Sequence, residues 1–223
     1  MRPTTLGLLL LLASGCDEAT VPAEEPAVDM ELPARGRPVF FRIVKSPPEL
    51  EAFLEESPGG AFVRVGGWPI CKWSGELGPK LREGDRQSPE GFYFVTRSRM
   101  NPNSRYHLAF DIGFPNDYDR AQDRTGSYIM VHGGCASVGC FAMTDPGIEE
   151  IYALADAALA GGQPFFRVHV FPFPMTGANL ERHRDSPWID FWENLAEGWR
   201  HFEERRRPPD VQVRDGRYAF EPS

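Results

Sequence analysis

The chain has 223 residues, which is long enough for one domain with its own hydrophobic core and extensions at its ends. Its composition is 41% hydrophobic and 12% aromatic, which is typical of a folded protein and argues against a disordered one. The 24 basic and 32 acidic residues give a formal charge of −8. Because nucleic-acid binding requires a concentrated basic surface, this balance argues against a nucleic-acid partner.

The first residues read as an export signal. Arg2 precedes an apolar run over residues 6–12, too short to cross a bilayer as a helix, and small residues then lead to Cys16. This order resembles a bacterial lipoprotein signal over residues 1–15, with lipid on the Cys16 thiol. The alternative is an ordinary secretory signal. Either one predicts a protein of the periplasm or cell envelope, where disulfides persist, and the lipoprotein reading predicts membrane contact only through the N-terminal lipid.

Residues 16–37 are rich in Pro, Ala and acidic residues and have no hydrophobic periodicity. Such a composition buries too little apolar surface to fold, so we expect a flexible tether that links the anchor to a folded part.

The first half of the folded part is predicted to be mostly strands. Residues 39–45 are a β-rich run bounded by prolines, whereas Leu50, Phe53 and Leu54 indicate a short helix over 47–57. Residues 61–73 predict two strands, broken at Gly66-Gly67 and Pro69. Further strands are predicted within 91–98, 105–114 and 127–133. The last is a nearly continuous apolar run, which indicates a central strand.

The second half adds two main helices. Asp145 is a predicted N-cap with Pro146 at the first helical position, and Gly161-Gly162 ends this helix. Residues 164–173 return to a strand. A helix within 186–209 is predicted to pack on the domain through one stripe, formed by Trp188, Trp192, Leu195, Trp199 and Phe202.

A final short strand is predicted within residues 211–220. The sequence therefore predicts a β-rich α+β fold. We expect a catalytic domain over residues 38–178 and a C-terminal helix and strand, over 179–223, packed on it.

The stretch VHGGCASVGC, residues 131–140, holds one histidine and two of the four cysteines. His132, Cys135 and Cys140 have the donor atoms of a zinc site, but structural zinc usually has four ligands and a Cys-x-x-Cys pair. A disulfide is the second interpretation, either Cys135–Cys140 or Cys71–Cys135. If Cys16 is lipidated, three cysteines remain, so at least one thiol stays unpaired in the monomer.

The third interpretation is a catalytic thiol at Cys140. Gly139 permits a tight turn, a helix is predicted to start near Asp145, and His132 at a strand end can reach the same loop. Backbone N–H groups around Gly139, Cys140 and Phe141 would then hold an oxyanion. The alternative for His132 is a strand-end histidine bonded to a backbone carbonyl.

These motifs resemble a known family, the YkuD-type L,D-transpeptidases. HGGCASVGC resembles their active-site motif, a His-Gly step followed by Ser-x-Gly-Cys. GDRQSPEGFYFV, residues 84–95, resembles their Thr-Pro-x-Gly-x-Phe turn and strand, and WPICKWSG, residues 68–75, resembles the preceding strand. The combined pattern over residues 38–205 looks like the YafK-like branch in particular.

The resemblance implies a β-rich fold with a sheet-lined cleft and no metal or organic cofactor. It implies Cys140 as the nucleophile and His132 as the general base, with Ser137 and Gly139 shaping the loop. The sequence departs from the common family pattern, because His132 lies only eight residues before Cys140. Val138 also replaces a second histidine, and Ala142 replaces an Arg or Asn. These departures concern substrate geometry and the direction of reaction more than the thiol chemistry.

The implied function is an exported cysteine acyltransferase that acts on peptidoglycan stem peptides and cross-links the wall or attaches a protein to it. The alternatives are an L,D-peptidase or amidase that hydrolyses the same bonds, and a non-catalytic peptidoglycan- or metal-binding lipoprotein. Four side chains are candidates to bind stem-peptide carboxylates, with solvated surface charge as the alternative for each: Lys80, Arg82, Arg86 and Arg105.

Overall fold

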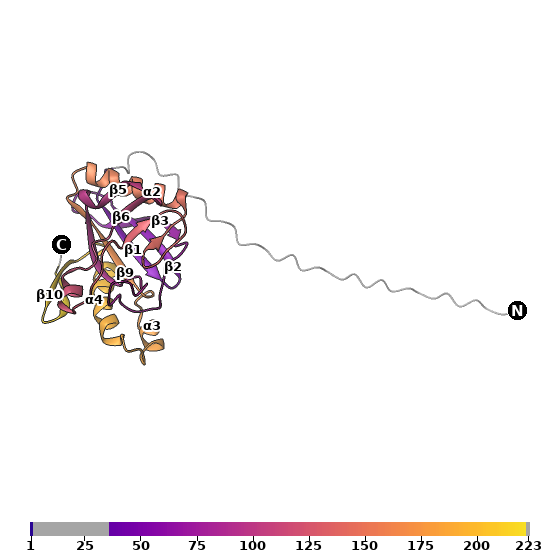
Figure 1. Cartoon of the computed structure of the whole chain (residues 1–223), viewed down its shortest axis with the longest axis vertical. Helices are drawn as coiled ribbons and strands as arrows, with labels where there is room; N and C mark the ends of the chain where they lie inside the picture. The colour runs from indigo at the N-terminus through magenta and orange to yellow at the C-terminus, as the bar shows by residue number, and fades with distance from the viewer. Residues whose placement is uncertain (2–35, 222–223) are drawn as a thin grey trace.

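We describe a computed structural model of the chain, in which Met1 and residues 36–221 are described (Figure 1). The predicted signal segment beyond Met1 and almost all of the predicted tether, including Cys16, lie outside the described residues. No helix in the described part of the chain has the length and apolar character needed to cross a membrane.

The described residues form two main sheets, a separate hairpin and four α-helices, which confirms the predicted β-rich α+β class. The larger sheet has the order β3-β2-β1-β9-β4, and the smaller has the order β5-β6-β7-β8. The bounds of the larger sheet are β1 (Val39–Lys45), β2 (Pro48–Glu55), β3 (Phe62–Pro69), β4 (Gly91–Thr96) and β9 (Phe165–Phe171). Those of the smaller sheet are β5 (Met100–Ser104), β6 (His107–Asp111), β7 (Met130–His132) and β8 (Phe141–Ala142).

The helices lie on opposite sides of these sheets (Figure 1). Figure 1 shows α2 (Asp145–Ala160) beside β5 and β6 at the top of the molecule, and α3 (Gly177–Arg182) and α4 (Ile189–Arg205) at the bottom. The remaining elements are α1 (Asp117–Ala121), a short 3-10 helix η2 (Arg97–Arg99), and the hairpin of β10 (Asp210–Arg214) and β11 (Arg217–Glu221).

Two apolar clusters hold the layers together. The main core packs α2 and the smaller sheet against the inner face of the larger sheet, through fully buried side chains such as Phe41, Phe110, Phe141, Ile151 and Phe166. The second cluster packs α4, α1 and β11 on the outer face of β4 and β9, through residues such as Phe92, Phe171, Trp192, Leu195 and Tyr218. The predicted stripe on the C-terminal helix therefore faces the domain. Burying each such large side chain contributes about 1.5–3 kcal/mol.

The predicted helix over 47–57 is wrong, because residues 48–55 form β2 and pair antiparallel with β1. Leu50, Ala52 and Leu54 face the main core, whereas Phe53 faces the opposite side and contacts Phe202. Burial on both faces hides the alternation expected of a strand, and the remaining apolar spacing imitates a helix.

Three other boundaries differ from prediction. Residues 62–69 form one strand, β3, at an edge of the larger sheet. It continues through Gly66-Gly67, with a register shift against β2 between Arg64 and Gly66. Residues 211–220 form a hairpin rather than one strand, because Asp215-Gly216 supplies the tight turn. The N-cap of α2 is Thr144, whose hydroxyl accepts the Gly147 N–H, so the Asp145 side chain is available for another contact.

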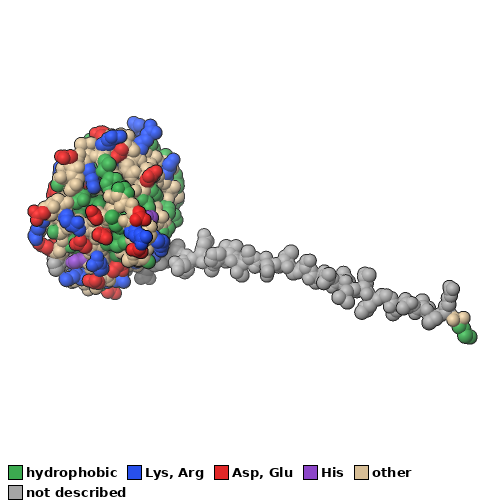
Figure 2. Space-filling view, turned by 90° about the horizontal axis from the view of Figure 1, so that it is seen from below, with side chains coloured by type: hydrophobic (Ala, Val, Ile, Leu, Met, Phe, Trp, Pro, Cys, Tyr) green, Lys and Arg blue, Asp and Glu red, His purple; other side chains and the backbone are tan. Residues whose placement is uncertain are grey.

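The predicted central strand is confirmed, because β7 lies between β6 and β8. On the face drawn in Figure 2, basic and acidic side chains are interspersed, and no continuous basic area is visible.

Candidate active site

Cys140 and His132 come from neighbouring strands of the smaller sheet. His132 ends β7, Cys140 directly precedes β8, and the two strands are parallel, with Val131 opposite Phe141. Extending this register by one residue places Cys140 beside Met130, which is two residues, or about 6–7 Å along the strand, from His132. The described structure contains no direct hydrogen bond between them. Catalytic hydrogen bonds are often long or absent before substrate binds, so this offset is compatible with a catalytic pair.

The Cys140 sulfur is held by backbone groups of the segment that leads into β7. Its Sγ accepts the Met130 N–H at 3.4 Å and donates to the Tyr128 carbonyl at 3.7 Å. Burial raises the pKa of the Cys140 thiol; the Met130 N–H lowers it, the Asp111 charge raises it and the Lys80 charge lowers it. The balance is a pKa above the ordinary value, so the resting group is a neutral thiol. The N-terminus of α2, which the sequence suggested as a source of thiolate stabilisation, is separated from Cys140 by β8.

His132 is 3% exposed and held in one tautomer. Its Nδ1 lies 2.6 Å from the Gly133 carbonyl oxygen, which can only accept, so Nδ1 carries the proton in the neutral ring. Burial lowers the pKa of His132, and the Gly133 hydrogen bond partly opposes this. The ring is therefore neutral at pH 7, with Nε2 free to accept a proton. The Tyr106 ring packs over it, with centroids 4.9 Å apart.

The loop before Cys140 is fixed by serine hydroxyls from two other segments. Ser137 and Ser88 both donate to the Cys140 carbonyl, at 2.6 and 3.2 Å, and Ser74 accepts the Gly139 N–H. Gly139 has φ +116°, a conformation that strongly favours glycine. Because the Gly139 N–H is engaged, the Cys140 N–H, for which no acceptor is found among the described residues, is the better candidate donor to an oxyanion.

Phe141, the third residue of the predicted oxyanion loop, lies inside β8, and its ring is fully buried in the main core. Its side chain therefore supports the strand from behind and does not line the site.

A disulfide joins Cys71 to Cys135, with Cα atoms 5.2 Å apart, which is one of the two pairings that the sequence left open. Beside it, Lys72 and Ala142 exchange two backbone hydrogen bonds, of 3.1 and 2.8 Å. The loop between His132 and Cys140 is thus attached covalently to the end of β3. Within the described part of the chain, Cys140 is the one free cysteine.

The disulfide bears on the zinc interpretation, because it removes Cys135 as a thiolate ligand. Among residues 36–221, no three His, Cys, Asp or Glu side chains come together in reach of one metal ion.

A cleft of about 270 Å³ opens at Cys140 and is lined by Lys80, Glu83, Gly84, Arg86, Gly126, Ser127, Tyr128, Ile129 and Val138. Of the four carboxylate-binding candidates, Lys80 and Arg86 line this cleft, whereas Arg82 and Arg105 are exposed residues outside its lining. The Lys80 ammonium is bonded to Asp85 at 2.5 Å and to the Arg82 carbonyl at 2.9 Å, so its charge is already compensated. Arg86 has no ion-pair partner within the described residues.

Sequence reasoning missed Ser74, Ser88, Tyr106 and Asp145 as neighbours of the site. Ser74 and Ser88 lie in the two segments, residues 68–75 and 84–95, that resemble the family, but that resemblance does not indicate contact with the Cys140 loop. His107, on β6, is engaged elsewhere, with its Nε2 2.6 Å from Glu149 on α2.

Residues 58–170, which carry both Cys140 and His132, match the L,D-transpeptidase catalytic domain of the YkuD family. The chain belongs to this family, whose members act on peptidoglycan stem peptides. It is 45% identical over 227 residues to a protein named "Putative L,D-transpeptidase YafK" in Escherichia coli strain K12, which covers 98% of this chain and 90% of that protein. A protein of the same name in E. coli O157:H7 has the same identity and coverage.

A solved structure shows the same fold. The helical cell shape determining protein Pgp2 from Campylobacter jejuni aligns with a TM-score of 0.50 and 18% identity, over 80% of this chain and 73% of that one. The predicted family and fold are therefore both confirmed.

Proposed function

We propose that this protein is a cysteine acyltransferase of peptidoglycan stem peptides, with Cys140 as its nucleophile and His132 as its general base. The observation that carries the proposal is a free thiol at a cleft, at the start of the strand that pairs with β7, where a buried, neutral histidine has its Nδ1 fixed by the Gly133 carbonyl. A base oriented by a third group is the arrangement that activates thiol nucleophiles.

In the first half-reaction, His132 Nε2 takes the Cys140 proton as Sγ attacks the carbonyl carbon of the stem peptide. A C–S bond forms, and the Cys140 N–H donates to the oxyanion. The C–N bond then breaks, and His132 returns its proton to the leaving amine. The product is a thioester on Cys140.

In the second half-reaction, an amine attacks the thioester carbon, and His132 takes its proton. The C–S bond breaks, a new amide bond is left, and His132 returns the proton to Cys140 Sγ. If water attacks instead, the same steps hydrolyse the stem peptide. Val138, which is 73% exposed, lines the cleft at the position where the family usually has a second histidine. The acceptor side of the cleft therefore differs from the common pattern, and hydrolysis is the second candidate reaction.

We also propose that the protein is exported and attached to a membrane by lipid on Cys16. The Cys71–Cys135 disulfide supports export, because such bonds persist in oxidising compartments and are rare in the cytosol. Metabolic labelling with palmitate should mark the wild-type protein and leave Cys16→Ala unlabelled. Equal labelling of both would contradict the anchor.

The catalytic proposal is tested with purified disaccharide tetrapeptides, with and without an amine acceptor, followed by chromatography and mass spectrometry. The wild type should form cross-linked or amine-exchanged products, or tripeptides if water is the acceptor, through a Cys140 thioester visible by intact mass. Cys140→Ala should form neither. Turnover by Cys140→Ala would overturn the assignment, and absence of turnover by the wild type would favour the non-catalytic alternative.

A further inference from the structure

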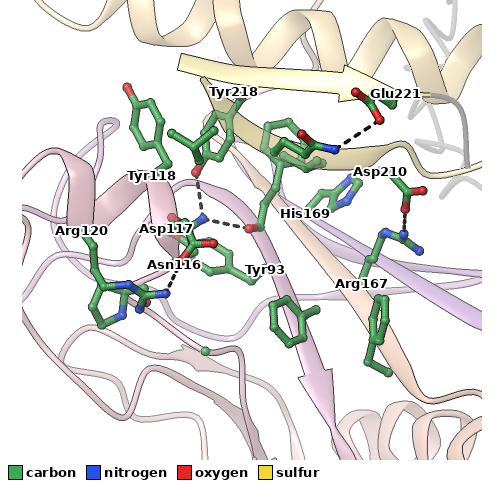
Figure 3. Close-up of a pocket in the computed structure, with 18 of the residues that line it drawn as sticks. Tyr93, Asn116, Asp117, Tyr118, Arg120, Arg167, His169, Asp210, Tyr218 and Glu221 are labelled. Carbon is green, nitrogen blue, oxygen red and sulfur yellow. Dashed lines mark hydrogen bonds and ion pairs between the residues drawn. The ribbon is translucent and has the colours of Figure 1, made fainter. Parts of the chain in front are cut away.

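A second and larger pocket, of about 470 Å³, lies away from Cys140 (Figure 3). It is enclosed by the outer face of β4 and β9, by α1 and by the β10–β11 hairpin. It shares no lining residue with the Cys140 cleft. Its hairpin wall lies beyond residue 170, where the match to the family's catalytic domain ends. The pocket is therefore separate from the site proposed for acyl transfer.

The floor of this pocket is formed by β4 and β9, which pair antiparallel. Phe92 lies opposite His169, and Phe94 lies opposite Arg167, so these four side chains project from the outer face of the sheet. Asn116, the N-cap of α1, donates to the Phe92 carbonyl at 2.8 Å and to the Tyr218 hydroxyl at 2.9 Å. These bonds tie α1, β4 and β11 together, so the walls are formed before any ligand binds.

The charges of the lining leave one cation without an ion-pair partner. Its acidic side chains Asp117, Asp210 and Glu221 are paired with Arg120, Arg167 and Arg214, and Figure 3 shows the first two of these pairs. Arg99, in contrast, has no acidic side chain within ion-pairing distance among the described residues; the acidic group that its charge affects is Asp111, whose pKa burial raises and Arg99 partly lowers. Arg99 donates to the Phe94 carbonyl at 2.9 Å, and its guanidinium lies 5.3 Å from the Phe94 ring centroid.

The rest of the lining is aromatic. Phe92, Phe94, Phe165 and Tyr118 supply flat apolar surface. At the floor, His169 is 1% exposed, and its Nε2 has no hydrogen-bond partner. This nitrogen is enclosed by the Phe40 and Phe92 rings, so His169 contributes packing surface to the floor and is not counted as a ligand contact.

We propose that this pocket is a second ligand site, which binds a carboxylate attached to a flat apolar group, with the carboxylate on Arg99. Guanidinium and carboxylate form charge-assisted, bidentate hydrogen bonds, and the aromatic walls accommodate the apolar body. The carboxylate belongs either to a free aromatic acid or to the C-terminal residue of a polypeptide.

The test is calorimetric titration of the full chain with 2-naphthylacetate and with its neutral analogue, 2-naphthylacetamide. The acid should bind saturably, and the amide should bind much more weakly. Arg99→Gln should weaken binding of the acid about tenfold or more, the range for a hydrogen bond to a charged group. Arg97→Gln is the matched control, because Arg97 is on the same 3-10 helix but pairs with Asp156 outside the pocket. Far-UV circular dichroism checks that both variants fold.

Equal affinity of wild type and Arg99→Gln, or no saturable binding of the acid by the wild type, would overturn the proposal. Alkylation of Cys140 should leave the affinity for naphthylacetate unchanged. Loss of binding after alkylation would show that the acid binds in the Cys140 cleft and would also overturn the proposal. The peptide Gly-Gly-Ser-Phe with a free and with an amidated C-terminus distinguishes the two sources. Tighter binding of the free peptide than of naphthylacetate supports a polypeptide C-terminus, and the reverse supports a small acid.

An independent observation concerns the peptide unit between Gly133 and Gly134. Its carbonyl oxygen is bonded to His132 Nδ1 at 2.6 Å, and its N–H donates to Asp145 Oδ1 at 2.8 Å. A Cβ on Gly133 would lie 2.6 Å from Asp145 Oδ1 and 3.0 Å from the Tyr106 carbonyl oxygen, so the contact requires glycine. One peptide plane thus connects a carboxylate to the imidazole.

A carboxylate that accepts from an amide N–H polarises the same amide and makes its carbonyl oxygen a stronger acceptor. That oxygen then stabilises the imidazolium that forms when His132 takes a proton. We infer that Asp145 is a positioning residue for His132, acting through the Gly133–Gly134 peptide. The inference rests on the proposed function of His132. Among the described residues, the other titratable group in contact with the ring is Tyr106, from the turn between β5 and β6.

The test compares Asp145→Asn with wild type by two readouts: the pH profile of Cys140 acylation by a carbapenem, and the NMR titration of the His132 ring. The variant should lower the pKa of His132 in both and slow acylation about tenfold. Glu149→Gln, on the same helix but bonded to His107, should match the wild type. An unchanged His132 titration in Asp145→Asn would overturn the inference. If wild type is not acylated at all, the proposed function fails, whereas the NMR titration still decides the role of Asp145.

Discussion

Cys135 and Cys71 are 64 residues apart in sequence, and their disulfide attaches the loop between His132 and Cys140 to the end of β3. The loop also contains Gly133, Gly134 and Gly139, which give its backbone much conformational freedom. The covalent link therefore restricts the segment that would otherwise be the most mobile part of the site.

Removal of this disulfide should destabilise the fold. The double variant Cys71→Ala/Cys135→Ala should lose about 2–4 kcal/mol of unfolding free energy, since the bond closes a long loop in the unfolded chain. The measurement is urea denaturation of both proteins under non-reducing conditions. Cys140→Ala serves as the control and should have the same urea denaturation midpoint as the wild type. Identical midpoints for the double variant and the wild type would contradict a structural role for the bond.

The Cys140 thiol should react slowly at neutral pH. Because burial raises its pKa, the rate of alkylation by iodoacetamide should reach half its maximum at a pH above about 8.5, the value for a free cysteine. Peptide-resolved mass spectrometry follows Cys140 without interference from Cys16. A half-maximum below pH 7 would indicate a preformed thiolate and contradict the resting state described here. Because folding raises the pKa of this thiol, its contribution to the free energy of unfolding is fully present below the pKa of the unfolded chain. That contribution is lost as the pH rises through the pKa of the folded protein.

His132→Gln should lower the rate of Cys140 acylation by a carbapenem roughly 10²–10⁴-fold, the usual contribution of a general base. Thermal stability should change little, because glutamine can retain a hydrogen bond to the Gly133 carbonyl. Intact mass measured over time gives the rate. His107→Gln is the control, since His107 is bonded to Glu149. Normal acylation of His132→Gln, together with its loss in His107→Gln, would transfer the role to His107.

Glu90→Gln should be strongly destabilising. The Lys45 and Glu90 side chains are both 0% exposed and lie 2.9 Å apart, so the variant leaves the Lys45 ammonium buried without its counter-charge. Breaking a buried pair in this way costs about 3–5 kcal/mol. Asp156→Asn, which breaks the exposed Arg97–Asp156 pair, should cost at most about 1 kcal/mol. Equal denaturation midpoints for the two variants would show that burial does not determine how much stability is lost when an ion pair is broken.

The sequence predicted the helices and strands that have one buried and one exposed face, because their apolar residues recur at a regular spacing. The C-terminal stripe of Trp192, Leu195 and Phe202 predicted α4 for that reason. The β2 strand was missed because the alternation of Glu49, Leu50, Glu51 and Ala52 breaks at Phe53, which is buried on the face opposite to Leu54. The hairpin at Asp215-Gly216 was missed although its turn residues are typical.

Within the candidate site, the sequence identified the residues that lie close together along the chain. His132 and Cys140 belong to one short motif, and the spacing between them is visible by inspection. Ser74, Ser88 and Asp145 reach the same loop only through tertiary packing, and nothing in their local sequence indicates where their side chains go. Likewise Arg82 and Arg105 have the right charge for carboxylate binding but lie outside the Cys140 cleft.

The Glu90 carboxylate has a consequence for recombinant fragments of this protein. Beyond its pair with Lys45, it accepts from Trp192 Nε1 at 2.8 Å, so its partners come from both sides of the matched region 58–170. A fragment cut to those limits would lack β1 and β2, which lie between β3 and β9 in the larger sheet, and also α4. It would keep Glu90 but lose both of these partners. The boundaries of family similarity are therefore unsuitable as expression boundaries, and limited proteolysis should not release residues 58–170 as a stable product.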